Sequence, residues 1–462
     1  MRRASAVAVM AIMVFASCDG GEMDVLRPGA PVASPTSSDA RVIGLVGTLS
    51  GPEAWRGEDA FEGADLAISE LNQEVDEGRP RYELVTRDDG GNPGIATQLV
   101  QQLASIDRTV GIIYAGPPEA LPAAEAALTQ AGIPAILLYG DLYSARLLRP
   151  HIFQSSPPLL WQARAMARYI ERDRGYRRIG VLVSRSPTAD TALVSLRTAF
   201  REQDIRRLRV FRYDDVVQMP DRLRRLKKAR VEALVVGGSG ESFAEALTIL
   251  RQRGQSYLTT RKARSKGSGR GRWNPQVFGF DSAIAPGQTT RLDKGTIAAD
   301  SYSRGPHLLP IPSLQRFHAA FTEWWDGDEP LGWELRAYDA VHMIGWASKN
   351  SSPGADLALV LEHLRKERFG GLTITLGPDD HTIVEQATVG LWVVPRGAFE
   401  PPSNVLPWLP LARGFSIDGE RTAAANEDWR YLFRNPPPPD GPAPKVTRMR
   451  YAVNSPRSDP IH

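Results

Sequence analysis

Short apolar runs alternate with amphipathic segments along most of this 462-residue chain, and this alternation restricts the folds that it can adopt. Residues 42–46 read Val-Ile-Gly-Leu-Val, as expected for a strand that is buried on both faces. Residues 58–71 then carry apolar side chains at helical spacing. Strands that alternate with helices predict right-handed crossovers and parallel sheets covered on both faces. The sequence therefore predicts an α/β fold.

The alternation runs through two consecutive series, which predict two doubly wound parallel-sheet lobes. The first lobe is expected over 41–152 and the second over 153–283, with the change near Phe153. The expected strands are 42–46, 82–87, 110–114, 134–138, 179–183, 209–213, 233–237 and 276–280. The expected helices are 58–71, 94–106, 121–131, 159–174, 188–203, 220–229 and 242–252. Ligands of such sheets bind outside the carboxyl ends of the strands, so the loops there are the candidate site.

The first 17 residues have the layout of a secretory signal peptide: a basic start, an uncharged apolar run and small residues before Cys18. The run is shorter than the roughly 20 apolar residues that span a bilayer. Its end resembles a bacterial lipobox, with Phe15 where leucine is usual. The resemblance implies cleavage before Cys18 and lipidation of its sulfur. The alternative is an ordinary signal peptide with a coincidental cysteine. Because Cys18 is the only cysteine, an intrachain disulfide is excluded.

The two ends of the exported chain differ in composition from its middle. Residues 18–40 are rich in Gly, Pro, Ser and Ala and predict a flexible tether, and residues 398–462 form a proline-rich extension. The 56 Lys and Arg nearly balance the 53 Asp and Glu, which gives no argument for a nucleic-acid partner. Residues 261–272 contain six basic residues and no acid. They predict either a solvated insertion or a loop that contacts anionic headgroups or an acidic partner.

Three stretches in order resemble one family. They are Ile43-Gly44-Leu45-Val46-Gly47-Thr48-Leu49-Ser50-Gly51-Pro52, then Ala131-Gly132-Ile133-Pro134-Ala135-Ile136, then Ala337-Tyr338-Asp339-Ala340-Val341. Together they are similar to landmarks of the branched-chain amino acid type of periplasmic (type I) substrate-binding protein, the receptors of ABC importers. The resemblance covers about 41–397. No single motif is specific, and the ordered series carries the resemblance.

The resemblance implies two lobes that close on a small ligand in a cleft between them and deliver it to an ABC permease. It implies that the chain returns to the first lobe over about 284–347 and to the second over about 348–397. It also implies a binding protein without cofactor or enzymatic activity. In agreement, the sequence lacks a Gly-x-Ser-x-Gly elbow, a His-Glu-x-x-His motif, a phosphate loop and a cysteine nucleophile, and its seven histidines are scattered, so no metal site is predicted.

Five residues of the first lobe are candidate ligand contacts by their match to the family: Ser50, Trp55, Gly116, Tyr139 and Asp141. Trp55 stands where the family often has an aromatic residue that packs on the ligand. The loop after Tyr114 departs from the family, whose serines there hold an amino acid carboxylate, because this chain has Ala115-Gly116-Pro117-Pro118. Asp141 would repel a carboxylate. These departures favour a cationic or amine-bearing ligand.

Two residues of the second lobe complete the predicted site. Asp281 stands where the family has an acidic residue that pairs with a ligand ammonium. Ser239 lies in a small-residue turn whose free N–H groups could bind an anion, although a tight strand-to-helix turn explains it equally well. Arg185 could receive an anionic group, but a solvated loop charge is the simpler interpretation.

Two functions remain open from the sequence. The first is a solute-binding protein that faces the periplasm or cell exterior, anchored through lipid on Cys18, which binds an amino acid, amine or amide-like ligand for an ABC importer. The alternative is a lipoprotein of the same fold that has lost transport and acts as a protein-interaction or regulatory module, such as a cell-wall synthase activator or sensor. The altered loops, the basic insertion and the long extension favour this alternative, whereas the landmarks through both lobes favour the solute-binding protein, which is the preferred interpretation.

Overall fold

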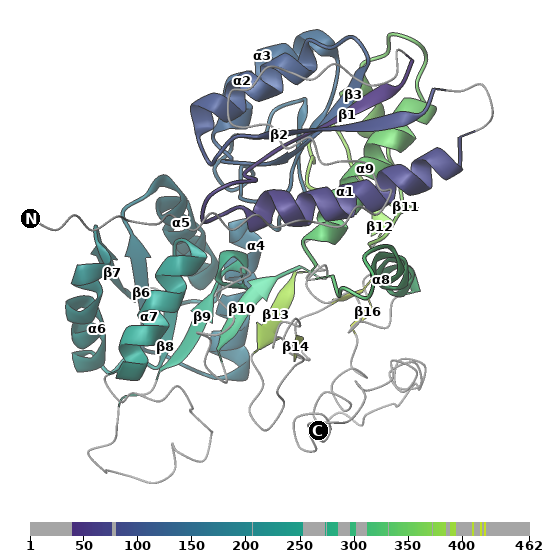
Figure 1. The fold of residues 1–462 in the computed structure, drawn as a ribbon. Helices are drawn as coiled ribbons and strands as arrows, with labels where there is room; N and C mark the ends of the chain where they lie inside the picture. Colours follow the sequence, from purple (N-terminus) through teal and green to yellow (C-terminus); the bar gives the residue numbers. More distant parts are fainter. Residues whose placement is uncertain are drawn as a thin grey trace, which may run out of the picture.

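The computed structural model describes residues 39–75, 80–205, 207–252, 273, 275–284, 296–301, 312–330, 332–371, 373–384, 389–393, 409–410, 416–417 and 420–421. The described chain forms two α/β lobes, the first of which lies at the top of Figure 1 and the second at the lower left. The predicted signal peptide, residues 18–38 of the predicted tether and the basic 261–272 segment lie outside the described residues.

The first lobe is built on a five-stranded parallel sheet with the strand order β2-β1-β3-β4-β5. Its strands are β1 (Arg41–Gly47), β2 (Tyr82–Asp88), β3 (Thr109–Ala115), β4 (Ala135–Leu137) and β5 (Ile152–Gln154). Its helices are α1 (Trp55–Gln73), α2 (Pro93–Ala104), α3 (Ala120–Ala131), α8 (Pro312–Trp324), α9 (Glu334–Lys349) and α10 (Leu357–Leu361). Two apolar clusters cover the sheet. One joins it to α1, α8, α9 and α10, and the other joins it to α2 and α3.

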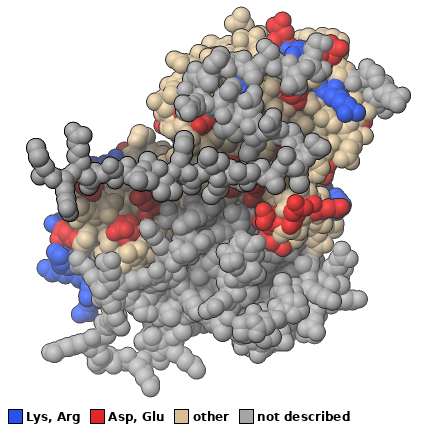
Figure 2. All heavy atoms as spheres, viewed as in Figure 1, with Lys and Arg blue, Asp and Glu red and all other residues tan. Residues whose placement is uncertain are grey.

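The second lobe is built on a seven-stranded sheet with the strand order β14-β13-β10-β9-β8-β6-β7. Its strands are β6 (Ile179–Ser184), β7 (Leu208–Tyr213), β8 (Ala233–Gly237), β9 (Gln276–Gly279), β10 (Ile297–Asp300), β13 (Gly390–Val393) and β14 (Leu409–Pro410). Its helices are α4 (Leu159–Arg168, continued by a π-turn at Tyr169–Asp173) and α5 (Pro187–Glu202) on one face, and α6 (Met219–Lys228) and α7 (Gly240–Gln252) on the other. Basic side chains gather near α6 (Figure 2).

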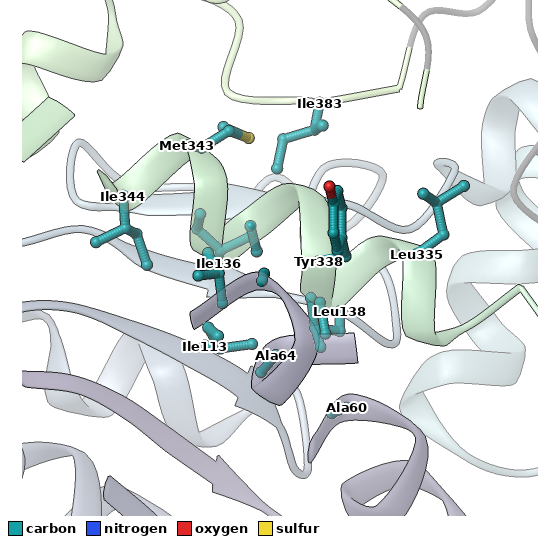
Figure 3. Packing of buried hydrophobic residues seen from close by; sticks show 14 of the residues in the cluster. Ala60, Ala64, Ile113, Ile136, Leu138, Leu335, Tyr338, Met343, Ile344 and Ile383 are labelled. Carbon is teal, nitrogen blue, oxygen red and sulfur yellow. The ribbon is translucent and has the colours of Figure 1, made fainter. Parts of the chain in front are cut away.

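The local sequence explains where these elements begin and how closely they pack. Asn92 caps α2, since its side chain accepts from the N–H groups of Gly94 and Ile95, and Pro93 occupies the first helical position. Helices α1 and α9 cross closely because Gly63 leaves room, as a Cβ there would lie 2.0 Å from the carbonyl oxygen of Glu334. Figure 3 shows α9 inside this cluster, with Ala60 and Ala64 of α1 and Ile113 of the sheet on one side and Met343 directed toward Ile383 on the other.

The chain crosses between the lobes several times, and it crosses at other residues than those expected from the sequence. The first crossing follows β5, which extends the first lobe to Gln154 instead of 152. β10 was expected in the first-lobe return segment 284–347 but pairs with β9 in the second sheet. Conversely, α10 and residues up to 384 were expected in the second lobe but contribute to the first-lobe core. Ile383 donates its N–H to Gln154, which anchors this segment beside β5.

Short strand pairs complete the described structure. β11 (Glu367–Arg368) pairs with β12 (Thr373–Ile374), and β15 (Ser416–Ile417) pairs with β16 (Glu420–Arg421). β13 runs antiparallel to β10 and to β14, so the second sheet is not wholly parallel. Within the described residues, no helix combines the length and apolar character needed to cross a membrane.

Candidate functional site

The candidate site lies where the carboxyl ends of strands from both sheets approach the crossing segments. In the first lobe, Trp55 begins α1 after the β1 loop, and Tyr139 follows β4. In the second lobe, Asp281 follows β9 and Asp300 ends β10. An ion pair joins the two sets, because Arg336 of α9 contacts Asp300. The structure therefore brings three of the predicted residues, Trp55, Tyr139 and Asp281, to one junction.

Three aromatic rings form a wall on the first-lobe side. Tyr139 lies edge-on to Trp55 with ring centroids 5.4 Å apart, and its centroid is 4.9 Å from that of Trp333. The rings of Trp55 and Trp333 are 5.6 Å apart. The guanidinium of Arg56 lies 5.5 Å from the Trp55 ring and 5.8 Å from the Tyr139 ring. Trp333 and Tyr139 are buried in the first-lobe core, and Trp55 is the partly exposed ring, which suits contact with a flat, apolar or cationic ligand group.

The hydroxyl of Tyr139 is buried inside this wall without a hydrogen-bond partner among the described residues. The side chain is only 4% exposed, and an unpaired buried hydroxyl costs about 1–3 kcal/mol. Burial, with smaller contributions from Asp59 and Glu334, raises the pKa of Tyr139 well above its ordinary value. The hydroxyl consequently keeps its proton and can donate to an acceptor that enters the site.

Arg336 is the central cation of the junction. Its guanidinium donates to Asp300 at 2.8 Å, to the Ser156 hydroxyl at 2.9 Å and to the Leu138 carbonyl at 3.2 Å. It also lies 4.2 Å above the ring of Trp333. The Arg336 side chain is 2% exposed and that of Asp300 is fully buried. One side chain thus joins the end of β4, the first crossing segment and the end of β10.

Asp281 lies near this cation on the second-lobe side. Its N–H donates to the side chain of Gln162 at 2.8 Å, and its carboxylate accepts from the N–H of Ser282. Burial and then repulsion from Asp300 raise the pKa of Asp281 to about 6, while Arg336 opposes the rise. A carboxylate in this position is stabilised further by an added positive charge, such as a ligand ammonium.

Gly116 lies in the loop after β3, where a side chain has no room. A Cβ there would lie 2.0 Å from a carboxylate oxygen of Asp89 and 2.7 Å from the Tyr114 hydroxyl. The other oxygen of Asp89 accepts from Thr48 and from the N–H of Gly91. The loop after β3 therefore presents backbone, and the serine hydroxyls of the family have no counterpart here.

Asp141 has a different role from the predicted ligand contact. One carboxylate oxygen accepts from the N–H of Ser144 at 2.8 Å and from Gln154 at 3.2 Å. The other accepts from the N–H of Leu159 at 2.8 Å, at the start of α4. Both oxygens are therefore engaged: the first holds the first-lobe loop to β5, and the second holds it to the start of the second lobe. The sequence prediction missed this because the helix start lies 18 residues farther along the chain.

Two further candidates lie at the surface, and neither contacts the aromatic wall. Ser50 is exposed in the loop after β1. Ser239 is exposed and caps α7, since its hydroxyl oxygen accepts from the N–H of Ser242 at 3.2 Å. This cap agrees with the strand-to-helix turn that was the alternative to an anion site. Arg185 pairs with Asp214 at 2.8 Å and both are exposed, in agreement with a solvated loop charge.

Four residues of the junction were missed from the sequence: Arg56, Asp300, Trp333 and Arg336. Arg56 directly follows Trp55, Arg336 directly precedes the Ala337-Tyr338-Asp339 landmark and Trp333 lies one helical turn before it, so their positions in the sequence could have indicated them. No such signal marks Asp300, which lies 36 residues before its partner. Cys18 lies outside the described residues. Among those described, no group of three or more His, Cys, Asp or Glu is placed to hold a metal ion.

Comparison with known proteins places this geometry in a family. The sequence matches the periplasmic binding protein family over residues 42–394. Among functionally curated proteins, none matches the chain. Many solved structures share the fold.

Three of these structures illustrate the likeness. A possible leucine/isoleucine/valine-binding protein from Rhodopirellula baltica SH 1 has 18% identity and a TM-score of 0.64, with 82% of this chain and 98% of that chain covered. A type 1 periplasmic binding protein from Bordetella pertussis Tohama I has 16% identity and a TM-score of 0.64, with 81% and 100% covered. The branched-chain amino acid transporter substrate binding protein LivJ from Streptococcus pneumoniae, solved with isoleucine, has 17% identity and a TM-score of 0.61, with 77% and 95% covered. The family match and the two-lobed fold confirm the resemblance found in the sequence, and the chain belongs to the periplasmic binding protein family.

Proposed function

We propose that this protein is an extracytoplasmic solute receptor whose two lobes close on a small amine-bearing ligand and deliver it to an ABC importer. The observation that carries the proposal is the junction itself. A buried, unpartnered Tyr139 hydroxyl lies in an aromatic wall on one lobe, and Asp281 lies on the other. Arg336 links the two sides, because it lies over Trp333, which packs on Tyr139, and pairs with Asp300, whose charge raises the pKa of Asp281. Closure of two lobes on such a site removes the ligand from water.

The polar groups of the junction favour a ligand with both an ammonium and an apolar part. Asp281 supplies a negative charge on the second lobe, and the partly exposed Trp55, which packs on the buried Trp333, supplies flat apolar surface on the first. The family's serine hydroxyls are replaced by backbone at Gly116, so Arg56 is the candidate group for a ligand carboxylate. Its guanidinium pairs with the half-exposed Glu53 at 2.8 Å, a surface-type contact of small energy that a ligand can replace. An amino acid, amine or amide fits this set, and the isoleucine bound by the Streptococcus relative supports an amino acid.

The site of action follows from the family and the predicted leader. Membership of the periplasmic binding protein family supports export, and the sequence of residues 1–18 supports retention at the membrane through lipid on Cys18. Mass spectrometry of the N-terminal peptide tests the anchor. We expect a diacylglyceryl-modified Cys18 as the first residue, whereas an unmodified peptide that begins elsewhere would contradict it.

A thermal-unfolding screen against amino acids, amines, amides and small peptides tests the binding function. A ligand that binds only the folded state stabilises it by about 2.7 kcal/mol at a hundredfold excess over its dissociation constant. We expect one chemical class to raise the midpoint, and Trp55→Ala, Tyr139→Phe and Asp281→Asn to reduce the shift. Two matched controls, Trp324→Ala and Asp214→Asn, change exposed residues away from the junction and should leave the shift intact.

One observation favours the second candidate, a regulatory or protein-interaction lipoprotein of the same fold. The buried ion pair between Arg336 and Asp300 joins the two lobes through the protein's own charges. If no compound in a broad screen shifts the midpoint, this self-contained junction favours the regulatory function. Capture of a specific partner from a membrane extract by the wild-type protein would then be the supporting result.

A further inference from the structure

The charge of the chain is unevenly distributed between its lobes. Residues 155–252, which form most of the second lobe, contain 20 Lys and Arg against 11 Asp and Glu. The whole chain has 56 against 53, so all residues outside this segment together carry a net negative charge. A nearly neutral protein therefore has one strongly basic lobe.

Much of this positive charge lies at one edge of the second sheet. β6, β7 and β8 are parallel, so their amino ends share an edge. Arg207 and Arg209 lie at the start of β7, and Arg172 lies in the turn that precedes β6. Lys227 and Lys228 end α6, and Arg230 follows in the connection to β8. We name these six residues (Arg172, Arg207, Arg209, Lys227, Lys228 and Arg230) the distal basic face.

The residues of the distal basic face are exposed, and no ion pair joins any of them to another described residue. Two of the nearby carboxylates are engaged elsewhere. Glu171 pairs with Arg177 at 3.3 Å, and Glu232 pairs with Arg178 at 3.0 Å. Figure 2 shows the blue atoms of this region gathered at the lower left, where Figure 1 places α6.

We propose that the distal basic face binds the anionic headgroups of a phospholipid bilayer. The exposed large apolar residues of the described chain (Tyr143, Leu147, Val194, Val216, Val217, Trp324 and Leu359) all lie outside this face. A protein partner commonly requires an apolar or aromatic core in its interface, whereas a headgroup surface requires only accessible cations. The six cations come from separate elements and form a dispersed positive surface, which fits a continuous anionic surface.

The distal basic face lies far from the ligand site, so the proposed membrane contact does not block that site. It lies at the amino ends of the strands, whereas Asp281 and the junction lie at their carboxyl ends. Membrane contact through the distal basic face therefore leaves the ligand site free. The bound protein lies with its second lobe on the membrane and its first lobe away from it.

Co-sedimentation with vesicles tests the proposal. The full chain carries Cys18→Ser, so that no acyl chain contributes, and the vesicles are either pure phosphatidylcholine or an equal mixture with phosphatidylglycerol. We expect binding to the mixed vesicles, little binding to the neutral ones, and release at about 1 M salt, where the Debye length is about 3 Å. Each basic residue at an anionic surface contributes roughly fivefold in affinity, so K227Q/K228Q/R230Q should weaken binding about 100-fold.

A matched triple variant separates local from overall charge. R146Q/K349Q/K366Q removes the same charge from exposed positions of the first lobe and should leave vesicle binding unchanged. Circular dichroism confirms that both triple variants remain folded. Equal loss in the two variants, equal binding to neutral vesicles, or binding to neither vesicle would overturn the proposal. Binding to an acidic protein in the absence of vesicle binding would overturn it as well.

Discussion

Removal of Arg336 should destabilise the protein severely. Arg336→Met keeps the apolar stem but leaves Asp300 buried without its cation, and it deletes the bonds to Ser156 and Leu138. Loss of one partner from a buried ion pair costs about 3–5 kcal/mol, because the other charge stays out of water. Asp300→Asn should cost a similar amount, since it strands the guanidinium. The double variant should cost about as much as one single variant, because neither member of the pair remains as a buried charge without the other.

Equilibrium urea unfolding, followed by circular dichroism and tryptophan fluorescence, measures all four proteins of this cycle. The exposed pair Arg164–Glu202, 2.9 Å apart, provides the control, and Arg164→Met should cost less than about 1 kcal/mol. A coupling energy of about 2–3 kcal/mol or more between positions 336 and 300 agrees with the account. A loss below about 1 kcal/mol for Arg336→Met, or additive losses in the double variant, would refute the reasoning.

Three other substitutions have defined outcomes. Asp281→Asn should stabilise the ligand-free protein by about 1–3 kcal/mol above pH 6 and give no gain below pH 4. The reason is that the folded pKa of Asp281, about 6, exceeds the unfolded value of about 3.9, so the ionised carboxylate destabilises the folded state. Thermal unfolding across pH measures this gain, and a pH-independent effect would contradict it. Tyr139→Phe should leave unfolding unchanged or raise the midpoint, since its hydroxyl has no described partner, and a clear loss measured by calorimetry would reveal a missed bond. Gly63→Ala should lower the free energy of unfolding by about 1–3 kcal/mol, because the added methyl group forces α1 away from α9. The control Gly327→Ala adds a methyl group in open space and tests only backbone strain. Unchanged stability of Gly63→Ala in urea would contradict the close crossing.

The local elements could be predicted from the sequence because each has its own periodic pattern. The strand at 233–237 was predicted with its observed bounds, and α1 was predicted at its centre, although it extends farther at both ends. What the pattern could not give was pairing between distant segments. β10 and β13 are short apolar runs whose sheet membership depends on partners far along the chain, so the lobe boundaries after 284 were misplaced.

The candidate site was only partly predictable for a related reason. Tyr139 and Asp281 lie two residues after their strands, Trp55 begins the helix after β1, and the general rule for α/β sheets accounts for their place at the junction. Their contact with a ligand stays a prediction. Asp141 satisfies the same rule but is engaged at the start of α4, a contact that no local pattern indicates. Arg336 was missed because an arginine within a helix has no recognisable role until its distant partner, Asp300, is known.

The central claim is that the two lobes close on a small ligand at the Tyr139–Asp281 junction. The most direct measurement is small-angle X-ray scattering of the protein with and without the compound that raises its unfolding midpoint most. The account predicts a smaller radius of gyration on ligand addition in the wild-type protein, and a weaker response at the same ligand concentration in Asp281→Asn. A ligand that binds tightly while the scattering curve stays unchanged, or that compacts Asp281→Asn equally well, would contradict it.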